Sequence, residues 1–218
     1  MPDPVVTILD YGVGNLRSVA RAFEVCGAKP VLAENPAQAA GADRLVIPGV
    51  GAFQSCVVAL RKAGFVDVIQ QVVDANQRPV LGICVGMQML LDVSEEFGEH
   101  EGLGHIRGRV SQIPSASPTG DRQKVPHIGW APLRPPSGAP AGWWSDTILQ
   151  DTFIGADVYF VHSFAAVADR DADVLAVTDY GSEQICAAVR RDNLYGVQFH
   201  PEKSGLAGLA IIRSFLTL

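Results

Sequence analysis

The sequence has little of what metal-binding, nucleic-acid-binding or membrane proteins need. Its 218 residues include only four cysteines, which are scattered along the chain without the short spacings of metal ligands. The net charge of -6 leaves no basic excess for nucleic acid or for a membrane surface. No apolar run approaches the length that spans a bilayer, and no stretch before the first predicted strand resembles a signal peptide. We therefore predict a cytoplasmic protein with reduced thiols that holds no metal and no cofactor.

One cysteine stands out because of its neighbours. Residues 79–83 form a continuous apolar run typical of a buried parallel strand, and Gly82 and Gly86 flank Cys84 in the order Gly-x-Cys-x-Gly. This is the order of a nucleophile elbow, in which a sharp strand-to-helix turn exposes the nucleophile. Glycine is needed there because side chains would collide with neighbouring elements. An apolar helical segment is expected from Met87. On these residues alone, a buried structural cysteine in a glycine-rich turn is an equal alternative.

A partner for this cysteine stands near the C-terminus. Residues 195–199 form a second strand-like run, which ends at His200, Pro201 and Glu202. Proline cannot extend a strand ladder, so the chain leaves the sheet there. An imidazole at the carboxyl end of a parallel strand lies on the same edge of the sheet as the elbow. Glu202 can accept the other ring N–H and fix the tautomer, so the sequence predicts that Cys84, His200 and Glu202 meet at this edge.

Two other glycine-rich turns follow predicted strands. Residues 44–47 run into a Pro-Gly-Val-Gly turn, in which Gly49 and Gly51 allow backbone N–H groups to point at a developing oxyanion. A simple tight turn between strand and helix is the alternative. The glycines after residues 5–9 lack the third glycine of a dinucleotide-binding loop, because Arg17 occupies that position. We therefore do not expect nucleotide binding at the first turn.

The remaining pattern predicts the fold. The predicted strands are residues 5–9, 31–32, 44–47, 79–83, 158–161, 174–178, 185–189 and 195–199, and the predicted helices are residues 16–26, 55–62, 66–76, a segment from 87, and 205–218. Turns at 179–182 and 191–193 predict an antiparallel extension. The polar residues 98–126 fit short strands at a sheet edge, with His100 and His105 exposed. We predict a single flavodoxin-like α/β domain over residues 1–218, with a mixed central sheet and helices on both faces.

The sequence resembles the class I (triad) glutamine amidotransferases. The motifs that carry the resemblance are GICVGMQ at residues 82–88 and FHPEKSG at residues 199–205. The resemblance covers almost the whole chain, through LDYGVGNLRSV at 9–19, PGVGAF at 48–53, KVPHIGW at 124–130 and YFVHSF at 159–164. It implies that Cys84 is the nucleophile, His200 the general base and Glu202 the orienting acid in hydrolysis of the side-chain amide of L-glutamine.

The resemblance also implies the residues that bind glutamine. The N–H groups of Gly51 and Val85 would hold the oxyanion, and a backbone flip at Val50 could switch this hole on or off. Gln88 follows Cys84 by one helical turn, so its amide lies on the same face as the thiol. The implied substrate-binding residues are Gly49, Gly51, Gln88, His162, Ser163 and Phe164, the backbone of the last three holding the α-carboxylate. Phe164 stands where the family commonly has tyrosine.

A partner subunit follows from the same resemblance, which is strongest to glutaminases that work in a heterodimer with a (β/α)8 barrel cyclase. The cyclase would receive the ammonia through an internal channel, so the chain alone is expected to have low activity. Contact candidates are Asn15, Arg17, Trp130 and Lys203. Each has a simpler interpretation: a solvated turn for Asn15 and Arg17, a core side chain for Trp130, and a solvated charge for Lys203.

Three other functions are compatible with parts of the pattern. A glutaminase could serve another synthase, such as one that makes anthranilate or pyridoxal phosphate, although KVPHIGW, PGVGAF and YFVHSF argue against it. A stand-alone γ-glutamyl or cysteine hydrolase would work fully without a partner. A catalytically silent flavodoxin-like interaction module is disfavoured by the intact Cys84, His200 and Glu202.

Overall fold

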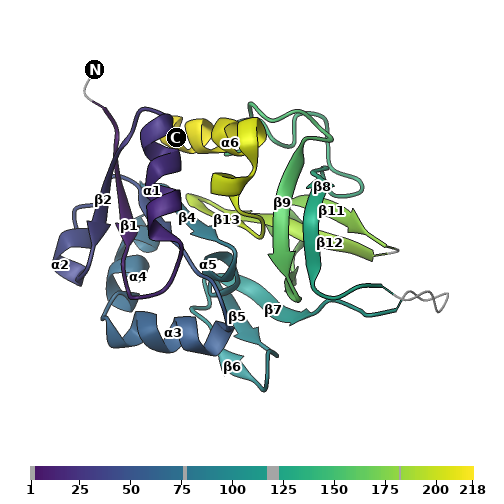
Figure 1. Ribbon diagram of the computed structural model, residues 1–218, viewed down its shortest axis with the longest axis horizontal. Coiled ribbons are helices and arrows are strands. Elements are labelled where there is room, and N and C mark those ends of the chain that lie inside the picture. The colour runs from purple at the N-terminus through teal and green to yellow at the C-terminus, as the bar shows by residue number, and fades with distance from the viewer. Residues whose placement is uncertain (1–2, 76–77, 117–122, 182) are drawn as a thin grey trace.

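The computed structural model describes residues 3–75, 78–116, 123–181 and 183–218 (Figure 1). The predicted helix end at residue 76, the turn residue 182 and residues 117–122 of the polar segment lie outside these ranges. None of the described helices is both long enough and apolar enough to cross a membrane.

A seven-stranded mixed sheet forms the centre of the molecule, in the order β11-β12-β13-β4-β3-β1-β2. Its strands are β1 (Val5–Leu9), β2 (Lys29–Ala33), β3 (Leu45–Ile47), β4 (Val80–Ile83), β11 (Val174–Tyr180), β12 (Glu183–Arg191) and β13 (Leu194–Val197). The five strands from β13 to β2 are parallel, and β11 and β12 add the predicted antiparallel extension. β3, β4 and β13 are buried along their whole length, because helices cover both faces of a parallel sheet.

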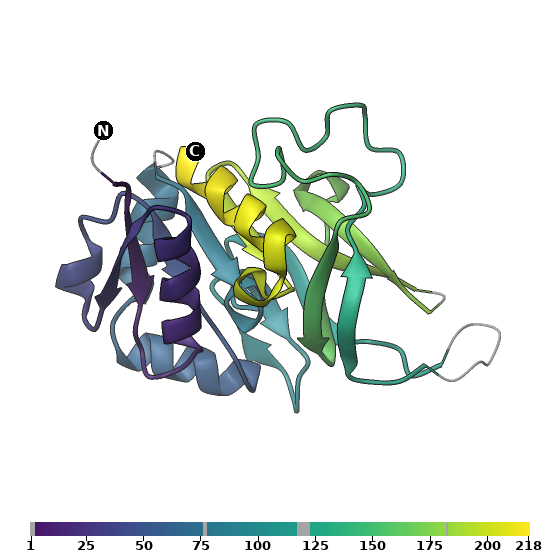
Figure 2. The same ribbon diagram turned by 45° about the horizontal axis from the view of Figure 1, so that its top comes forward.

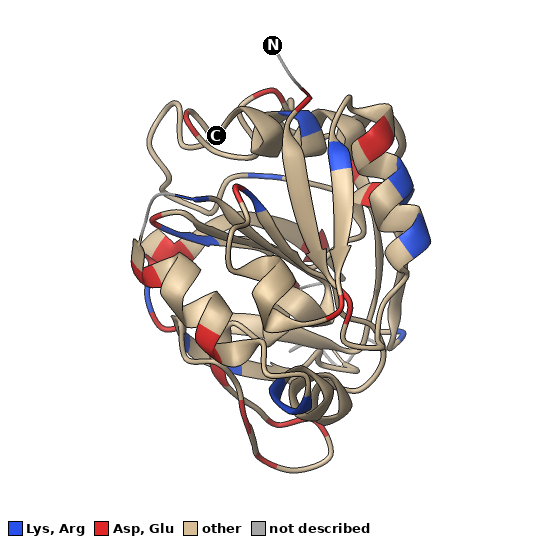
Figure 3. Ribbon diagram, turned by 90° about the vertical axis from the view of Figure 1, so that its left-hand side faces the viewer, with Lys and Arg blue, Asp and Glu red and all other residues tan. Residues whose placement is uncertain are grey.

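Helices lie on both faces of this sheet. α1 (Leu16–Val25) and α6 (Gly205–Thr217) lie side by side on one face, where Phe23 meets Phe215 edge to face at 6.1 Å (Figure 2). Further helices are α2 (Pro36–Ala39), α3 (Phe53–Lys62), α4 (Val66–Ala75) and the short α5 (Val85–Gln88), with 3-10 turns η1 (Asp171–Asp173) and η2 (Pro201–Lys203). α3 and α4 pack on the opposite face of the sheet (Figure 1). In the view of Figure 3, lysine and arginine positions and aspartate and glutamate positions both occur along the described helices, strands and loops.

Two smaller sheets stand beside the central one and were not predicted. One contains β5 (Leu91–Ser94), β6 (His100–Glu101), β7 (Ile106–Gln112) and β10 (Phe164–Ala168), in the order β10-β7-β5-β6. The other is an antiparallel ribbon of β8 (His127–Pro132) and β9 (Asp157–His162). The predicted segment 98–126 therefore contributes to a separate sheet, and not to an edge of the central one.

Two predictions in this region were wrong. The helix after the elbow, α5 (Val85–Gln88), ends before the apolar run is over, and β5 begins at Leu91. Met89, Leu90 and Leu91 are fully buried, so the run reflects burial on all sides and not one face of a long helix. His105, expected to be exposed, is buried, and its backbone carbonyl accepts a hydrogen bond from Arg191.

Candidate active site

The turn from β4 into α5 holds Cys84 in an unusual conformation. Its φ is 54° and its ψ is -112°, a region that L residues rarely adopt. The flanking glycines are required by close packing: a Cβ on Gly82 would come within 2.7 Å of the Gly86 carbonyl oxygen, and a Cβ on Gly86 would overlap the Ile47 carbonyl oxygen. The Cys84 backbone N–H donates to Val197 of β13 at 2.7 Å. The elbow is therefore fixed by both strands that adjoin β4.

His200 lies beside Cys84 because of the parallel register of β13 and β4. Val197 pairs with Ile83, so the residues after each strand come out at the same edge of the sheet. The His200 Nδ1 and Glu202 Oε1 atoms are 2.9 Å apart, and the two side chains are only 3% and 1% exposed. Burial alone would lower the pKa of His200, but hydrogen bonds and charge interactions with Cys84 and Glu202 raise it to about 9. These contacts favour the protonated imidazole over the neutral one.

The Pro-Gly-Val-Gly turn packs directly against this elbow. A Cβ on Gly49 would come within 2.5 Å of the Gly86 backbone nitrogen, so only glycine allows this approach. The Tyr11 hydroxyl donates to the Pro48 carbonyl, and the Cys56 thiol donates to the Val50 carbonyl at 3.3 Å. Burial raises the pKa of Cys56 to about 11, so the thiol keeps the proton that it donates. Two side chains thus hold the carbonyls of this turn.

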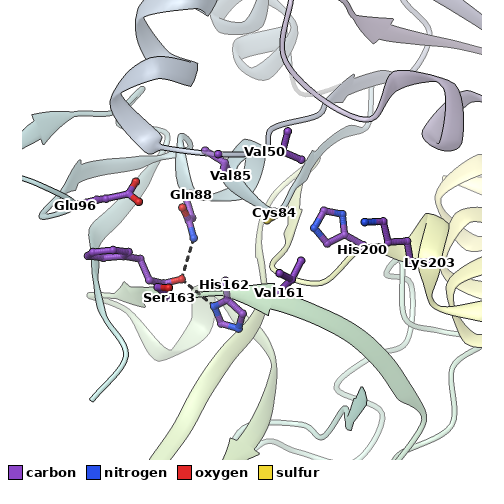
Figure 4. Close-up of a pocket in the computed structure, with 12 residues that line it drawn as sticks. Val50, Cys84, Val85, Gln88, Glu96, Val161, His162, Ser163, His200 and Lys203 are labelled. Atoms are coloured by element: carbon purple, nitrogen blue, oxygen red, sulfur yellow. Dashed lines mark hydrogen bonds between the residues drawn. The ribbon is translucent and has the colours of Figure 1, made fainter. Parts of the chain in front are cut away.

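A cavity of about 300 Å³ opens at this point (Figure 4). It is lined by Val50, Gly51, Cys84, Val85, Gln88, Glu96, Val161, His162, Ser163, Phe164, His200 and Lys203. Of the predicted substrate-binding residues, all but Gly49 line it, and Gly49 lies in the packed turn beneath. Glu202 lies behind His200. Asn15, Arg17 and Trp130 are exposed outside the lining, whereas Lys203 lines it.

One wall of the cavity is organised by a buried pair of histidines. His162 Nδ1 donates to the Phe164 carbonyl oxygen at 2.9 Å, which leaves its Nε2 as the acceptor for His127 Nδ1 at 3.1 Å. Burial lowers the pKa of both histidines to about 4, so both are neutral. The Phe164 carbonyl also accepts from the Gln88 side-chain amide at 3.0 Å (Figure 4). These hydrogen bonds join α5 and the end of β9 to the first residue of β10.

Four residues of this region were missed by sequence reasoning. Glu96 lines the cavity and accepts a hydrogen bond from the Phe53 backbone N–H at 2.6 Å. His127, Tyr11 and Gln198 act through contacts with residues that are far away in the sequence. Only Gln198 carries a sequence signal, because it stands two positions before His200 and residues two apart along a strand share a face. No group of three potential metal ligands occurs among the described residues.

The shifted pKa values of three histidines predict how the free energy of unfolding depends on pH. His127 and His162 have folded pKa values near 4, below the ordinary 6.5, so the unfolded chain binds more protons and stability falls as pH drops from about 6.5 to 4. His200 has a folded pKa near 9, so its contribution is complete below about 6.5 and is lost as pH rises through 9. We expect the free energy of unfolding in urea to peak near pH 6.5. In His200→Asn the decline between about pH 6.5 and 9 should shrink and the acid decline should remain; unchanged profiles would contradict this assignment.

The site combines a cysteine in a strained strand-to-helix turn with an imidazole that is paired with a buried carboxylate. This arrangement is typical of α/β enzymes that catalyse acyl transfer. The family model of class-I glutamine amidotransferases matches residues 7–217. The chain belongs to this family.

Within this family, the chain is similar to subunits of one particular synthase. The chain is 48% identical over 213 residues to imidazole glycerol phosphate synthase subunit HisH 1 of Legionella pneumophila (strain Lens), covering 98% of this chain and 99% of that protein. It is 46% identical to subunit HisH of the same synthase from Syntrophotalea carbinolica, over 97% of this chain and 98% of that protein. Among solved structures, PurLQS from Thermotoga maritima matches with a TM-score of 0.75 at 20% identity, covering 99% of this chain and 98% of that one. A crystal structure of a glutamine amidotransferase matches with a TM-score of 0.70 at 20% identity, over 97% of both chains. These two structures share the fold.

Proposed function

We propose that this chain is the glutaminase subunit of imidazole glycerol phosphate synthase and that it hydrolyses L-glutamine to glutamate and ammonia. The observation that carries the proposal is the arrangement of Cys84, His200 and the buried Glu202 at the cavity of about 300 Å³. Near-full-length similarity to HisH subunits of two organisms supports the same assignment over a glutaminase of another synthase.

The reaction divides into two halves that share one histidine. In the first, the Cys84 thiolate attacks the amide carbon, His200 gives its proton to the departing nitrogen, and the C–N bond breaks to leave a thioester and ammonia. In the second, neutral His200 takes a proton from water as it attacks the thioester, and glutamate leaves as the electron pair returns to sulfur. Glu202 holds the His200 ring at 2.9 Å throughout.

The oxyanion of both halves is assigned to backbone N–H groups. Val85 is the first residue of α5, where backbone N–H groups have no acceptor within the helix, and Gly51 lines the opposite side of the cavity. Gly51 has a φ of +91°, a conformation that favours glycine. Val50 precedes it, so rotation of the backbone at Val50 would change which groups face the oxyanion and switch the hole on or off.

The walls of the cavity match the two ends of glutamine. Glu96 supplies a carboxylate for the α-ammonium group. The segment of His162, Ser163 and Phe164 supplies backbone for the α-carboxylate, and the neutral histidine adds no repulsive charge. Gln88 lines the cavity above this segment (Figure 4), and because its Nε2 donates to Phe164 and Gln198, its Oε1 is the atom that can accept from the substrate.

A cyclase partner is assigned to the face at the mouth of the cavity. Ile128 and Trp130 of β8 are 53% and 56% exposed there, and the Trp130 ring meets Tyr159 of β9 edge to face. Lys203, which lines the cavity, places its ammonium group over the Tyr159 ring at 5.9 Å. A (β/α)8 barrel cyclase docked on this face would receive ammonia without exposing it to solvent. Its products would be imidazole glycerol phosphate and aminoimidazole carboxamide ribonucleotide.

The test is glutamate release from glutamine by this chain, alone and with an equimolar cyclase subunit and its nucleotide ligand. We expect low activity alone, strong stimulation by the liganded cyclase, and no activity in Cys84→Ala. Full activity without the cyclase would indicate a free-standing hydrolase. Absence of activity under both conditions would favour a binding module.

Replacing Trp130 by alanine should weaken the subunit contact selectively. Exposed aromatic side chains at the centre of an interface often contribute about 2 kcal/mol or more, so the cyclase concentration for half-maximal stimulation should rise by about 30-fold. Glutamate release by the chain alone should not change, because Trp130 does not line the cavity. Phe153→Ala is the matched control, since this exposed aromatic residue lies outside β8 and β9. Equal effects of the two variants would argue against this face.

A further inference from the structure

Gln198 is a fully buried polar side chain next to the proposed nucleophile. It follows β13 directly, and its backbone N–H donates to Ala187 of β12 at 2.9 Å, which extends the strand by one residue. The chain then bends at Gln198 and Phe199, and both the Gln198 amide and the His200 imidazole contact Cys84. The Gln198 Nε2 atom lies 3.7 Å from Cys84 Sγ.

The orientation of this amide is fixed by a chain of hydrogen bonds. The Phe164 backbone carbonyl can only accept, so the Gln88 atom 3.0 Å from it must be the Nε2 donor. The same Gln88 Nε2 lies 2.9 Å from Gln198, so the Gln198 atom facing it must be the Oε1 acceptor. The remaining amide atom of Gln198, which faces the sulfur, is therefore the N–H donor. A backbone carbonyl thus determines which group Cys84 meets.

We propose that Gln198 is a further catalytic residue, whose amide N–H donates to the Cys84 sulfur while its carbonyl holds Gln88. This inference rests on the proposed glutaminase activity. The buried N–H meets the charge of the thiolate before attack and again when the C–S bond of the thioester breaks and the electron pair returns to sulfur. Hydrogen bonds to charged groups are the stronger ones, and a buried site enhances them. Gln198 therefore links the nucleophile to the residue that faces the substrate amide.

Two substitutions separate the two halves of this role. Gln198→Glu is nearly isosteric and keeps an oxygen acceptor for Gln88, but it replaces the N–H donor with a carboxylate oxygen next to sulfur. Gln198→Met has a similar length and removes both hydrogen bonds. Gln184→Glu is the control, because it makes the same chemical change at an exposed position of β12 that does not line the cavity.

The experiment measures the rate of Cys84 alkylation by iodoacetamide against pH on the full chain, and glutamine kinetics with the cyclase and its ligand. We expect Gln198→Glu to move the midpoint of alkylation to higher pH by about one unit or more and to lower kcat by about 10- to 100-fold, with KM within about threefold. Gln198→Met should also lower kcat and should raise KM as well, because Gln88 loses its acceptor. Gln184→Glu should match the unmodified chain in both measurements.

Several outcomes would overturn the proposal. An unshifted alkylation profile and unchanged kcat in Gln198→Glu would show that the N–H does not act on sulfur. A kcat loss with an unshifted alkylation profile would show a structural role only. Folding of each variant is checked by its affinity for the cyclase; if Gln198→Glu does not fold, the alkylation profile of Gln198→Met decides. The alkylation profile needs no glutamine, so it tests Gln198 even if the chain proves to lack glutaminase activity.

Discussion

Glutamate release in the presence of the cyclase should fall by about 10⁴-fold or more when Cys84 is replaced by alanine. No other described group in the cavity can form the thioester, because the remaining thiols do not line it. The folded structure should persist, because the side chain is small and the strained backbone at this position does not require sulfur.

The matched control for this prediction is Cys186→Ala. Cys186 is also buried, but it lies in β12 outside the cavity that Cys84 lines, and burial raises its pKa to about 12. Its replacement should leave kcat within about twofold. If Cys84→Ala retained a substantial fraction of the activity, hydrolysis would have to proceed without a covalent intermediate and the proposed role of Cys84 would be wrong.

Replacing Gly86 by alanine should have the largest effect on stability. The new methyl group would overlap the carbonyl oxygen of Ile47, which belongs to the backbone of β3 and cannot rotate away. Either the elbow or β3 must shift, so we expect a loss of about 3–5 kcal/mol in the free energy of unfolding. This is a large share of the roughly 5–15 kcal/mol that is typical of a folded protein. Urea unfolding followed by circular dichroism measures this loss.

Gly41→Ala is the corresponding control. A methyl group added to the Gly41 Cα would meet no heavy atom within 4 Å, and Gly41 is not among the positive-φ glycines, so this substitution should change stability by less than about 0.5 kcal/mol. A Gly86→Ala chain as stable as the Gly41→Ala chain would contradict the close approach of β3 and the elbow.

The parallel part of the fold follows from local sequence. The runs that form β3, β4 and β13 are continuously apolar, and β1 contains only one polar residue, because helices cover both faces of the sheet. Such runs can be recognised in a single sequence. Glycines and a proline at the ends of these strands then place Cys84 and His200 at one edge. This much of the candidate site was predictable because it depends on strand direction alone.

The rest depends on partners that are distant in the sequence. The start of β5 was assigned to a helix because the apolar run at residues 87–91 continues into it without a clear period, whereas Leu91–Ser94 forms a strand by pairing with β6 and β7. Glu96 was missed for the same reason, because it follows that misassigned segment. The orientation of the Gln198 amide is set by its hydrogen bond with Gln88, which is 110 positions away in the sequence. His127 belongs to the KVPHIGW motif, in which only Trp130 was assigned a role from the sequence.

The ribbon of β8 and β9 has a consequence for how this chain tolerates insertions. Ile128 and Trp130 point outward while His127 and Ala131 point inward, because side chains alternate along a strand. Adding or deleting one residue inside β8, between Ile128 and Gly129, would put His127 and Trp130 on the same face, so that one of them would lose its place. A change of two residues would keep both faces in place. Length variation inside β8 should therefore be even-numbered in any chain that keeps both the exposed tryptophan and the histidine pair.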